Sequence, residues 1–258
     1  MRVRLDIEYD GMMFSGWQRQ EGGIITVQET IESALYKVFG GLNSVVLYGA
    51  GRTDAGVHAI NQVAHFEANF ENFIKRWGQN IGKLALAINF YLHDSGCVIK
   101  NSSIVPNDFH ARFSAKQRQY VYIISNQHSD SVLFKNRAWC VRKPLDIELM
   151  NEAAKFFVGE HNFNAFRSSQ CQARSAIRTI DSIAVVSNKN LIYIEVAAKS
   201  FLHNQVRIIV GTLKEIGARR MDKNIVKALL EDKSPPDRRK SGPTAPAFGL
   251  YFKNVIYP

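Results

Sequence analysis

The chain has 258 residues, of which 46% are hydrophobic and 22% are charged, as is ordinary for a soluble globular protein. It has no run of about eighteen apolar residues, so the sequence predicts no membrane-spanning helix. Lys and Arg number 33 against 23 Asp and Glu. The net charge of +10 favours a polyanionic partner, nucleic acid before a membrane surface. A basic protein with dispersed charge and no such partner is the plainer alternative.

The three cysteines, Cys97, Cys140 and Cys171, are far apart in the sequence. Their spacing matches neither a zinc site nor a set of internal disulfides, so reduced thiols in a reducing compartment are the simplest interpretation. The histidines show no ligand spacing either, and we expect no metal. Residues 1–6 run straight into a strand pattern and do not resemble a signal peptide. We therefore expect a cytoplasmic protein.

The first hundred or so residues have the pattern of a β-α-β-β-α-β unit. The expected elements are a strand over residues 3–9, a helix from a capping box at Thr26 to Gly40-Gly41, strands over 45–47 and 62–66, a helix over 73–88, and strand segments over 97–99 and 104–105. This order is that of a ferredoxin-like unit, which has helices on one face of an antiparallel sheet.

The rest of the chain repeats this order without repeating the sequence, so a duplication is only suggested. The expected elements are a strand over 119–124, a helix over 146–157, strands over 176–186 and 191–198, helices over 203–217 and 223–230, an exposed basic loop over 235–240, and a last strand over 250–252. We therefore expect an α+β protein of two ferredoxin-like (RRM-like) halves, residues 1–107 and 108–258. Their antiparallel sheets would be joined across a central catalytic cleft, with helices on one face.

A glycine-rich loop over residues 48–59 presents one cation and one carboxylate, Arg52 and Asp54. Its glycines allow positive φ and the close approach of another backbone or a ligand. The plain interpretation is a solvated hairpin with a weak surface ion pair. The loop contains neither lysine nor glutamate, which is unusual for such a turn. Nearby, residues 14–20 form an aromatic and basic loop, which is either functional or a packing corner.

The segment Gly51-Arg52-Thr53-Asp54-Ala55-Gly56-Val57-His58-Ala59 closely resembles the signature G-R-T-D-A-G-V-H-A of the TruA family of tRNA pseudouridine synthases. Other segments resemble this family in the same order along most of the chain. They are residues 8–11, 16–20, 26–28, 109–115, 118–122, 159–163, 201–211 and 245–250. Each segment alone is modest evidence, and their joint order makes coincidence a poor explanation.

The resemblance implies an isomerase that converts uridines 38, 39 and 40 of the tRNA anticodon arm to pseudouridine without a cofactor. It also implies a homodimer that binds tRNA. By the same resemblance, Asp54 is the catalytic carboxylate, Arg207 orients it, and Tyr120 stacks on the detached uracil. A carboxylate can attack carbon, take a proton or stabilise an oxocarbenium ion, and the sequence leaves these three roles open.

Further residues are expected to contact the substrate. By the resemblance, Arg52 would fill the gap left by the flipped base. Leu250 would cover the other face of that base. Two polar or aromatic segments would contact RNA: Phe109, His110, Ala111, Arg112 and Phe113, and Gln170, Cys171, Gln172, Ala173 and Arg174. The simpler alternatives are a core leucine for Leu250, a core aromatic for Tyr120 and a surface helix arginine for Arg207.

Two other classes of protein fit parts of the pattern. A non-catalytic RNA-binding protein of two RRM-like units is the main alternative, although the RNP1 pattern is absent. A glycoside hydrolase or nucleosidase would normally use two carboxylates, and only Asp54 stands in the signature loop.

Overall fold

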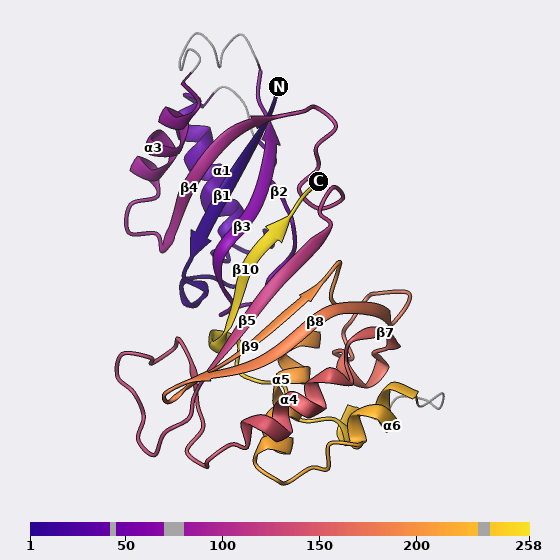
Figure 1. Ribbon diagram of the computed structural model, residues 1–258. Helices are drawn as coiled ribbons and strands as arrows, with labels where there is room; N and C mark the ends of the chain where they lie inside the picture. The colour runs from indigo at the N-terminus through magenta and orange to yellow at the C-terminus, as the bar shows by residue number, and fades with distance from the viewer. Residues whose placement is uncertain (42–44, 70–79, 232–237) are drawn as a thin grey trace. The chain divides into compact units, whose positions relative to one another are not determined.

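The computed structural model describes residues 1–41, 45–69, 80–231 and 238–258. The chain forms two compact units, and each is described here by itself (Figure 1). The first unit contains residues 1–116 and 252–258, and the second contains residues 117–251. The sequence placed the division after residue 107 and left the C-terminal strand wholly in the second half. In the structure the first unit continues to residue 116 and also includes residues 252–258.

The first unit has the ferredoxin-like order that the sequence predicted. Its elements are β1 (Arg2–Tyr9), α1 (Val27–Val38), β2 (Tyr48–Gly49), β3 (His58–Glu67), α3 (Gly82–Tyr91) and β4 (Cys97–Val105), with the end of β10 (Leu250–Ile256). The strand order is β4-β1-β3-β10, and β2 also pairs with β3. Leu5 in the central strand β1 lies opposite Ala64 of β3 and Ser102 of β4, both antiparallel.

Alternation along β1 separates a core face from a polar face. Val3, Leu5 and Ile7 are fully buried. Helices α1 and α3 cover one face of this unit's sheet (Figure 1). Arg4 and Asp6 lie on the opposite face and form an ion pair of 2.8 Å. The period-two pattern in the sequence predicted this arrangement, because successive side chains of a strand point to opposite sides of the sheet.

Helix α1 begins where the capping box predicted. Thr26 has an extended backbone conformation, and its side-chain oxygen accepts a hydrogen bond of 3.4 Å from the Glu29 amide. The second predicted helix lies partly outside the described residues, since residues 73–79 are not among them. Its described part, α3, ends at Tyr91 rather than at residue 88.

The strand predicted over residues 45–47 is wrong, because pairing with β3 begins at Tyr48. Side chains of α1 satisfy the backbone of Leu47 instead. Its amide donates to a Glu32 carboxylate oxygen at 2.9 Å, and its carbonyl accepts from Gln28 Nε2 at 3.2 Å. These hydrogen bonds use groups that a sheet ladder would need.

The second unit is also α+β. Its elements are β5 (Gln117–Ser125), β6 (Trp139–Cys140), α4 (Ile147–Lys155), β7 (Gly159–Asn162), β8 (Ile177–Asn188), β9 (Leu191–Ala198), α5 (Gln205–Gly217) and α6 (Ile225–Glu231). The strand order is β5-β9-β8-β7, and β6 pairs with β5 in parallel. Short 3₁₀ helices lie at Gly11–Met13 in the first unit and at Asn164–Phe166, Arg238–Lys240 and Ala247–Gly249 in the second.

The predicted strands and helices of the second unit are confirmed, with shifted ends. Helix α5 starts at Gln205 rather than at residue 203, because Asn204 has a left-handed backbone with φ of 62°. Helix α4 stops at Lys155 rather than at residue 157, and Gly159 opens β7. The predicted basic loop over 235–240 lies partly outside the described residues, and its described part is the 3₁₀ helix Arg238–Lys240.

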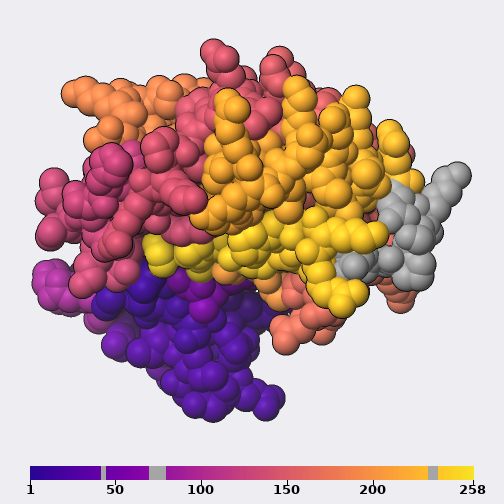
Figure 2. Space-filling model, turned by 90° about the horizontal axis from the view of Figure 1, so that it is seen from below, coloured from indigo at the N-terminus to yellow at the C-terminus, as the bar shows by residue number. Residues whose placement is uncertain are grey.

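Helix α5 packs very closely against the segment over residues 241–245. A Cβ added to Gly211 would lie 1.7 Å from the Pro243 carbonyl oxygen. One turn earlier, the Ala245 amide donates to the Arg207 carbonyl at 3.1 Å. Figure 2 shows this unit from its helical side, where amber side chains from the end of α5 and from α6 stand at the surface. Gly211 therefore permits the approach that positions Arg207 relative to this segment.

Candidate active site

The signature loop, residues 50–57, connects β2 to β3 and is held by backbone hydrogen bonds at both ends. The Ala50 amide donates to the Val63 carbonyl at 2.7 Å, and the Val57 amide donates to the Asp54 carbonyl at 3.2 Å. In the middle, the Trp17 amide donates to the Thr53 carbonyl at 3.1 Å. These hydrogen bonds restrict a loop whose glycines would otherwise allow many conformations.

Two glycines elsewhere in the first unit allow the chain to approach this loop. A Cβ on Gly11 would lie 2.1 Å from the Val57 carbonyl oxygen. A Cβ on Gly16, whose φ is 103°, would lie 2.9 Å from the Thr53 carbonyl oxygen. The segments around these glycines are among those that resemble the TruA family, and the structure shows that they support the signature loop.

The aromatic loop over residues 14–20 is mainly a packing corner, one of the two interpretations that the sequence left open. Phe14 and Trp17 are buried beside Tyr9, at ring-centroid distances of 6.2 and 6.1 Å from it. Arg19 donates to the Glu32 carboxylate at 3.2 Å. The aromatic part of this loop therefore supports β1 and the signature loop.

Side chains alternate across the signature loop. Arg52 is exposed and Asp54 is half-buried, whereas Thr53 between them is buried. The loop thus buries Thr53 in the unit and leaves Arg52 and Asp54 at least partly accessible. This arrangement differs from a freely solvated hairpin, because one side of the loop is packed.

Three predicted site residues lie in the second unit. Tyr120 in β5 is 8% exposed and meets Phe201 edge-on at 5.1 Å. Leu250 is buried at the start of β10. Arg207 in α5 is half-buried, so it is not the fully solvated surface arginine of the simpler alternative. Because Asp54 lies in the first unit, the grouping of these residues into one site remains a prediction.

The Arg207 side chain is oriented by groups of its own unit. Its Nε donates to the Ala245 carbonyl at 2.7 Å, and one terminal nitrogen donates to Asn204 Oδ1 at 2.9 Å. The left-handed conformation of Asn204 places its amide oxygen in reach of the guanidinium. These two hydrogen bonds constrain the planar group and limit the directions in which it can meet a carboxylate.

In the first unit, the predicted RNA-contacting segment 109–113 belongs to an aromatic and histidine cluster. The His110 ring lies 4.6 Å from the His65 ring and 4.4 Å from the Phe113 ring, which is 75% exposed. The Arg112 guanidinium lies 5.6 Å from the centroid of the Phe113 ring. Tyr48 stacks on His65 at 5.2 Å. The sequence did not single out Tyr48 and His65 as neighbours of this segment, because their placement depends on the β2–β3 register.

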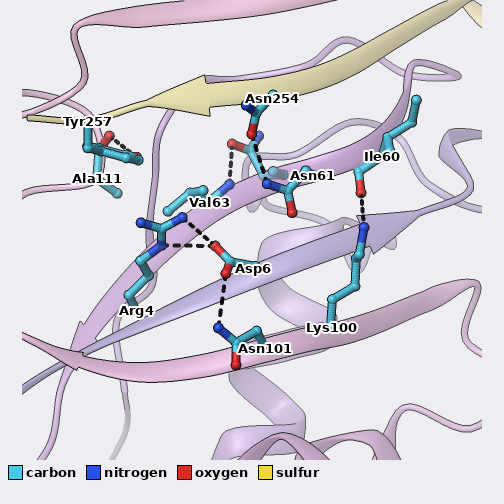
Figure 3. A network of polar contacts seen from close by, with 11 residues as sticks. Arg4, Asp6, Ile60, Asn61, Val63, Lys100, Asn101, Ala111, Asn254 and Tyr257 are labelled. Carbon is cyan, nitrogen blue, oxygen red and sulfur yellow. Dashed lines mark hydrogen bonds and ion pairs between the residues drawn. The ribbon is translucent and has the colours of Figure 1, made fainter.

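The C-terminal residues hold this segment against the polar face of the first sheet. Figure 3 shows Tyr257, whose hydroxyl donates to the Ala111 carbonyl at 2.7 Å. The Tyr257 ring also lies 4.9 Å from Phe109 and 5.1 Å from the Arg4 guanidinium carbon. On the same face, Asn61 of β3 donates to Asn254 of β10 at 3.0 Å (Figure 3). Contacts between distant parts of the chain therefore position residues 109–113.

Burial, His110 and Arg2 lower the pKa of His65 from 6.5 to about 4. The Ala111 amide donates to His65 Nδ1 at 3.1 Å, which requires that nitrogen to be unprotonated. Between these pKa values the unfolded chain binds a proton that the folded chain does not. His65 therefore contributes stability that is complete above about pH 6.5 and is lost as the pH falls through about 4.

Between about pH 7 and pH 5, we expect the unfolding free energy of His65→Asn to fall less than that of the wild-type protein. Urea unfolding at the two pH values measures this difference. The exposed histidine His93 gives a matched control, and His93→Asn should keep the wild-type loss. An equal pH dependence in His65→Asn and wild type would contradict this interpretation.

The second predicted RNA segment, residues 170–174, forms a surface loop of the second unit. Gln170, Gln172 and Arg174 are exposed. The Cys171 amide donates to the Ser168 carbonyl at 3.0 Å, which closes a turn. The loop is thus ordered by its own backbone and presents amide groups and a cation to solvent.

Within the residues that the structure describes, no three His, Cys, Asp or Glu side chains are arranged to hold a metal ion. The same residues include no helix that is long and apolar enough to cross a membrane. Cys97 is buried, and burial raises the pKa of its thiol to about 12.

Comparison with known proteins identifies the family to which this chain belongs. A family model described as tRNA pseudouridine synthase matches residues 153–258. The tRNA pseudouridine synthase A of Wolbachia pipientis wMel is 44% identical over 100% of both chains. The proteins of that name from Ehrlichia canis (strain Jake) and Ehrlichia ruminantium (strain Welgevonden) are 44% and 43% identical, also over 100% of both chains. The chain therefore belongs to the tRNA pseudouridine synthase A (TruA) family, as its signature loop predicted.

Among solved structures, a Cbf5-Nop10-Gar1 complex has a TM-score of 0.33 and 13% identity, over 82% of this chain and 45% of that one. A similarity at this level supports no structural argument.

Proposed function

We propose that this protein converts uridines 38, 39 and 40 of the tRNA anticodon arm to pseudouridine, with Asp54 as the catalytic carboxylate and without a cofactor. The observation that supports this most directly is the signature loop, which holds Asp54 half-buried beside the exposed Arg52. The names of the full-length relatives support the same reaction.

The reaction breaks the bond between ribose C1′ and uracil N1 and forms a bond from C1′ to C5. The hydrogen on C5 leaves as a proton and N1 takes up a proton, so the product is an isomer of the substrate. In this proposal an ionised Asp54 attacks carbon, takes a proton or stabilises positive charge on the ribose. Arg207 orients the carboxylate, and its own constrained guanidinium supports that role.

The base must leave the helical stack before it can react. We assign Arg52 to the space that the base leaves in the stack. We assign Tyr120 and Leu250 to the two faces of the base itself. A single aromatic face contributes roughly 1–3 kcal/mol per stacked base, which favours retention of a detached uracil. Residues 109–113 and 170–174 are proposed to contact RNA outside the reacting nucleotide. We further propose that the protein works as a homodimer in the cytoplasm.

Chemical mapping tests the proposed reaction. Unmodified tRNA is incubated with the protein, treated with a carbodiimide that leaves a stable adduct on pseudouridine, and read by primer extension. We expect new stops at positions 38, 39 and 40 in tRNAs that have uridine there. Folded protein that produces no stop in the anticodon arm would contradict the proposal.

Binding of tRNA should depend steeply on salt, because Lys and Arg that contact phosphates release counterions. If about four phosphates are neutralised, affinity falls roughly 10-fold for each doubling of salt concentration. Filter binding over a salt series measures the slope. Replacing the exposed Arg112 or Arg174 by Gln should reduce the slope of affinity against salt concentration. Arg220→Gln should leave this slope unchanged, since Arg220 pairs with Glu215. A salt-independent affinity would contradict a phosphate-contacting surface.

A further inference from the structure

The inward side of the signature loop belongs to a buried polar network. The proposed function assigns no role to the side chains of this network. The Thr53 hydroxyl lies 2.8 Å from the Tyr9 hydroxyl, and these residues are only 7% and 4% exposed. Tyr9 ends β1, so this hydrogen bond connects the central strand of the sheet to the residue between Arg52 and Asp54. If one of these two hydroxyls is removed, the other loses this hydrogen bond at a site where water cannot readily replace it.

Gln62 connects the same network to the other side of the loop. It is fully buried in β3, and its Nε2 donates to the Gly51 carbonyl at 2.9 Å. The Val63 amide donates to Gln62 Oε1 at 3.2 Å, which fixes the orientation of the side-chain amide. The Gln62 side chain also offsets part of the effect of burial on the pKa of Tyr9. The network thus holds the loop at Gly51 and at Thr53.

We propose that Tyr9 is a positioning residue for the reaction, and that its hydroxyl acts through Thr53 to fix the direction in which the loop presents Asp54. This inference rests on the proposed function, because it takes Asp54 as the reacting carboxylate. Burial raises the pKa of Tyr9, so its hydroxyl stays protonated at neutral pH and acts by hydrogen bonding rather than by proton transfer.

The Tyr9 hydroxyl is expected to affect the rate through the geometry of Asp54. Thr53 immediately precedes Asp54, so a rotation of its backbone turns the carboxylate away from the position that the reaction needs. A displacement of about 1 Å in a reacting group can cost roughly 100-fold in rate. The backbone hydrogen bond from Trp17 to the Thr53 carbonyl remains when the Tyr9 hydroxyl is removed, so only part of this effect is expected.

The test is Tyr9→Phe, which keeps the ring packed against Phe14 and Trp17 and removes only the hydroxyl. We expect kcat for pseudouridine formation to fall about 10-fold, with the Kd for tRNA unchanged. Ser102→Ala is the matched control, because the buried Ser102 hydroxyl donates to the Ile81 carbonyl at 2.8 Å in the same unit. Ser102→Ala should lower the melting temperature about as much as Tyr9→Phe does and should leave kcat unchanged.

The partner residue gives a second, independent variant. Thr53→Val keeps the shape of the side chain and removes the hydroxyl, and it should reproduce the loss in kcat. Thr53→Ser restores the hydroxyl and should restore kcat. Because Tyr9 and Thr53 act through one hydrogen bond, Tyr9→Phe combined with Thr53→Val should lose no more than either change alone.

Three results would overturn the assignment. One is an unchanged kcat in folded Tyr9→Phe, or in folded Thr53→Val if Tyr9→Phe does not fold. Another is an equal loss of kcat in Ser102→Ala, which would mean general destabilisation. The third is a weaker Kd with unchanged kcat, which would place the hydroxyl in RNA binding. An inactive wild-type protein would instead refute the proposed function, so the two failures are distinguishable.

Discussion

Replacing Asp54 by Asn is expected to abolish pseudouridine formation in a protein that still folds and still binds tRNA. The amide matches the carboxylate in size but has neither its negative charge nor its nucleophilicity. All three chemical roles open to Asp54 require the ionised form, so we expect a rate loss of about 10³-fold or more. Carbodiimide mapping under single-turnover conditions measures the rate, and filter binding measures the Kd.

Asp181 provides a matched control for this change. It lies on β8, and its carboxylate accepts a hydrogen bond of 2.7 Å from Gln117 Nε2 at the surface of the second unit. Asp181→Asn should keep the wild-type rate. If Asp54→Asn formed pseudouridine as fast as wild type, the catalytic role of Asp54 would be wrong. If neither wild type nor variant formed it while both bound tRNA, the non-catalytic RNA-binding alternative would be favoured.

Gly211→Ala is expected to destabilise the protein by about 3 kcal/mol or more, since its Cβ has no space. The nearest atom, the Pro243 carbonyl oxygen, is backbone and would lie 1.7 Å away. Relief requires α5 and the segment over residues 241–245 to separate. That movement would break the hydrogen bond between the Ala245 amide and the Arg207 carbonyl, so activity should fall as well. Urea unfolding measures the change in stability.

Gly82→Ala is the matched control for a methyl group added to a helix. Among the residues that the structure describes, its Cβ would meet the Asn80 side chain alone, at 3.4 Å. Because glycine costs roughly 0.5–1 kcal/mol in a helix relative to alanine, this variant should be neutral or slightly stabilised. A Gly211→Ala protein as stable as Gly82→Ala would show that α5 can move away from residues 241–245 at little cost.

The sequence predicted the first unit well where local patterns determine the structure. Alternation along β1 and the capping box at Thr26 are such patterns, and both are confirmed. The strand over residues 45–47 was wrong because Gln28 and Glu32, distant in sequence, bind the backbone of Leu47. The strands β6 and β7 were missed because two and four residues are too few to show a period.

The extent of the first unit depends on contacts that no local pattern contains. The Lys116 amide donates to the Ile256 carbonyl at 2.8 Å, and Tyr257 donates to the Ala111 carbonyl. These long-range hydrogen bonds connect residues 108–116 and the C-terminal residues to the same unit. The two compact units therefore have different bounds from a division placed by element order alone.

The candidate site was predictable as a motif, but its supports were not. Arg52 and Asp54 stand in a recognisable signature. Tyr9 and Gln62 meet the signature loop only through the register of β1 with β3. One signal was present in the sequence: Gln62 is an amide on the buried side of a strand, where an apolar residue is expected. Such a residue marks a backbone group that needs a partner.

The most direct test of the central claim uses tRNA whose uridines are labelled with tritium at C5. Bond formation at C5 must release that hydrogen, whereas binding or simple hydrolysis of the glycosidic bond does not. We predict that the wild-type protein releases tritium to water while every uracil ring stays attached to the RNA, and that Asp54→Asn releases none. Free uracil, or no tritium release from folded protein bound to tRNA, would contradict the account.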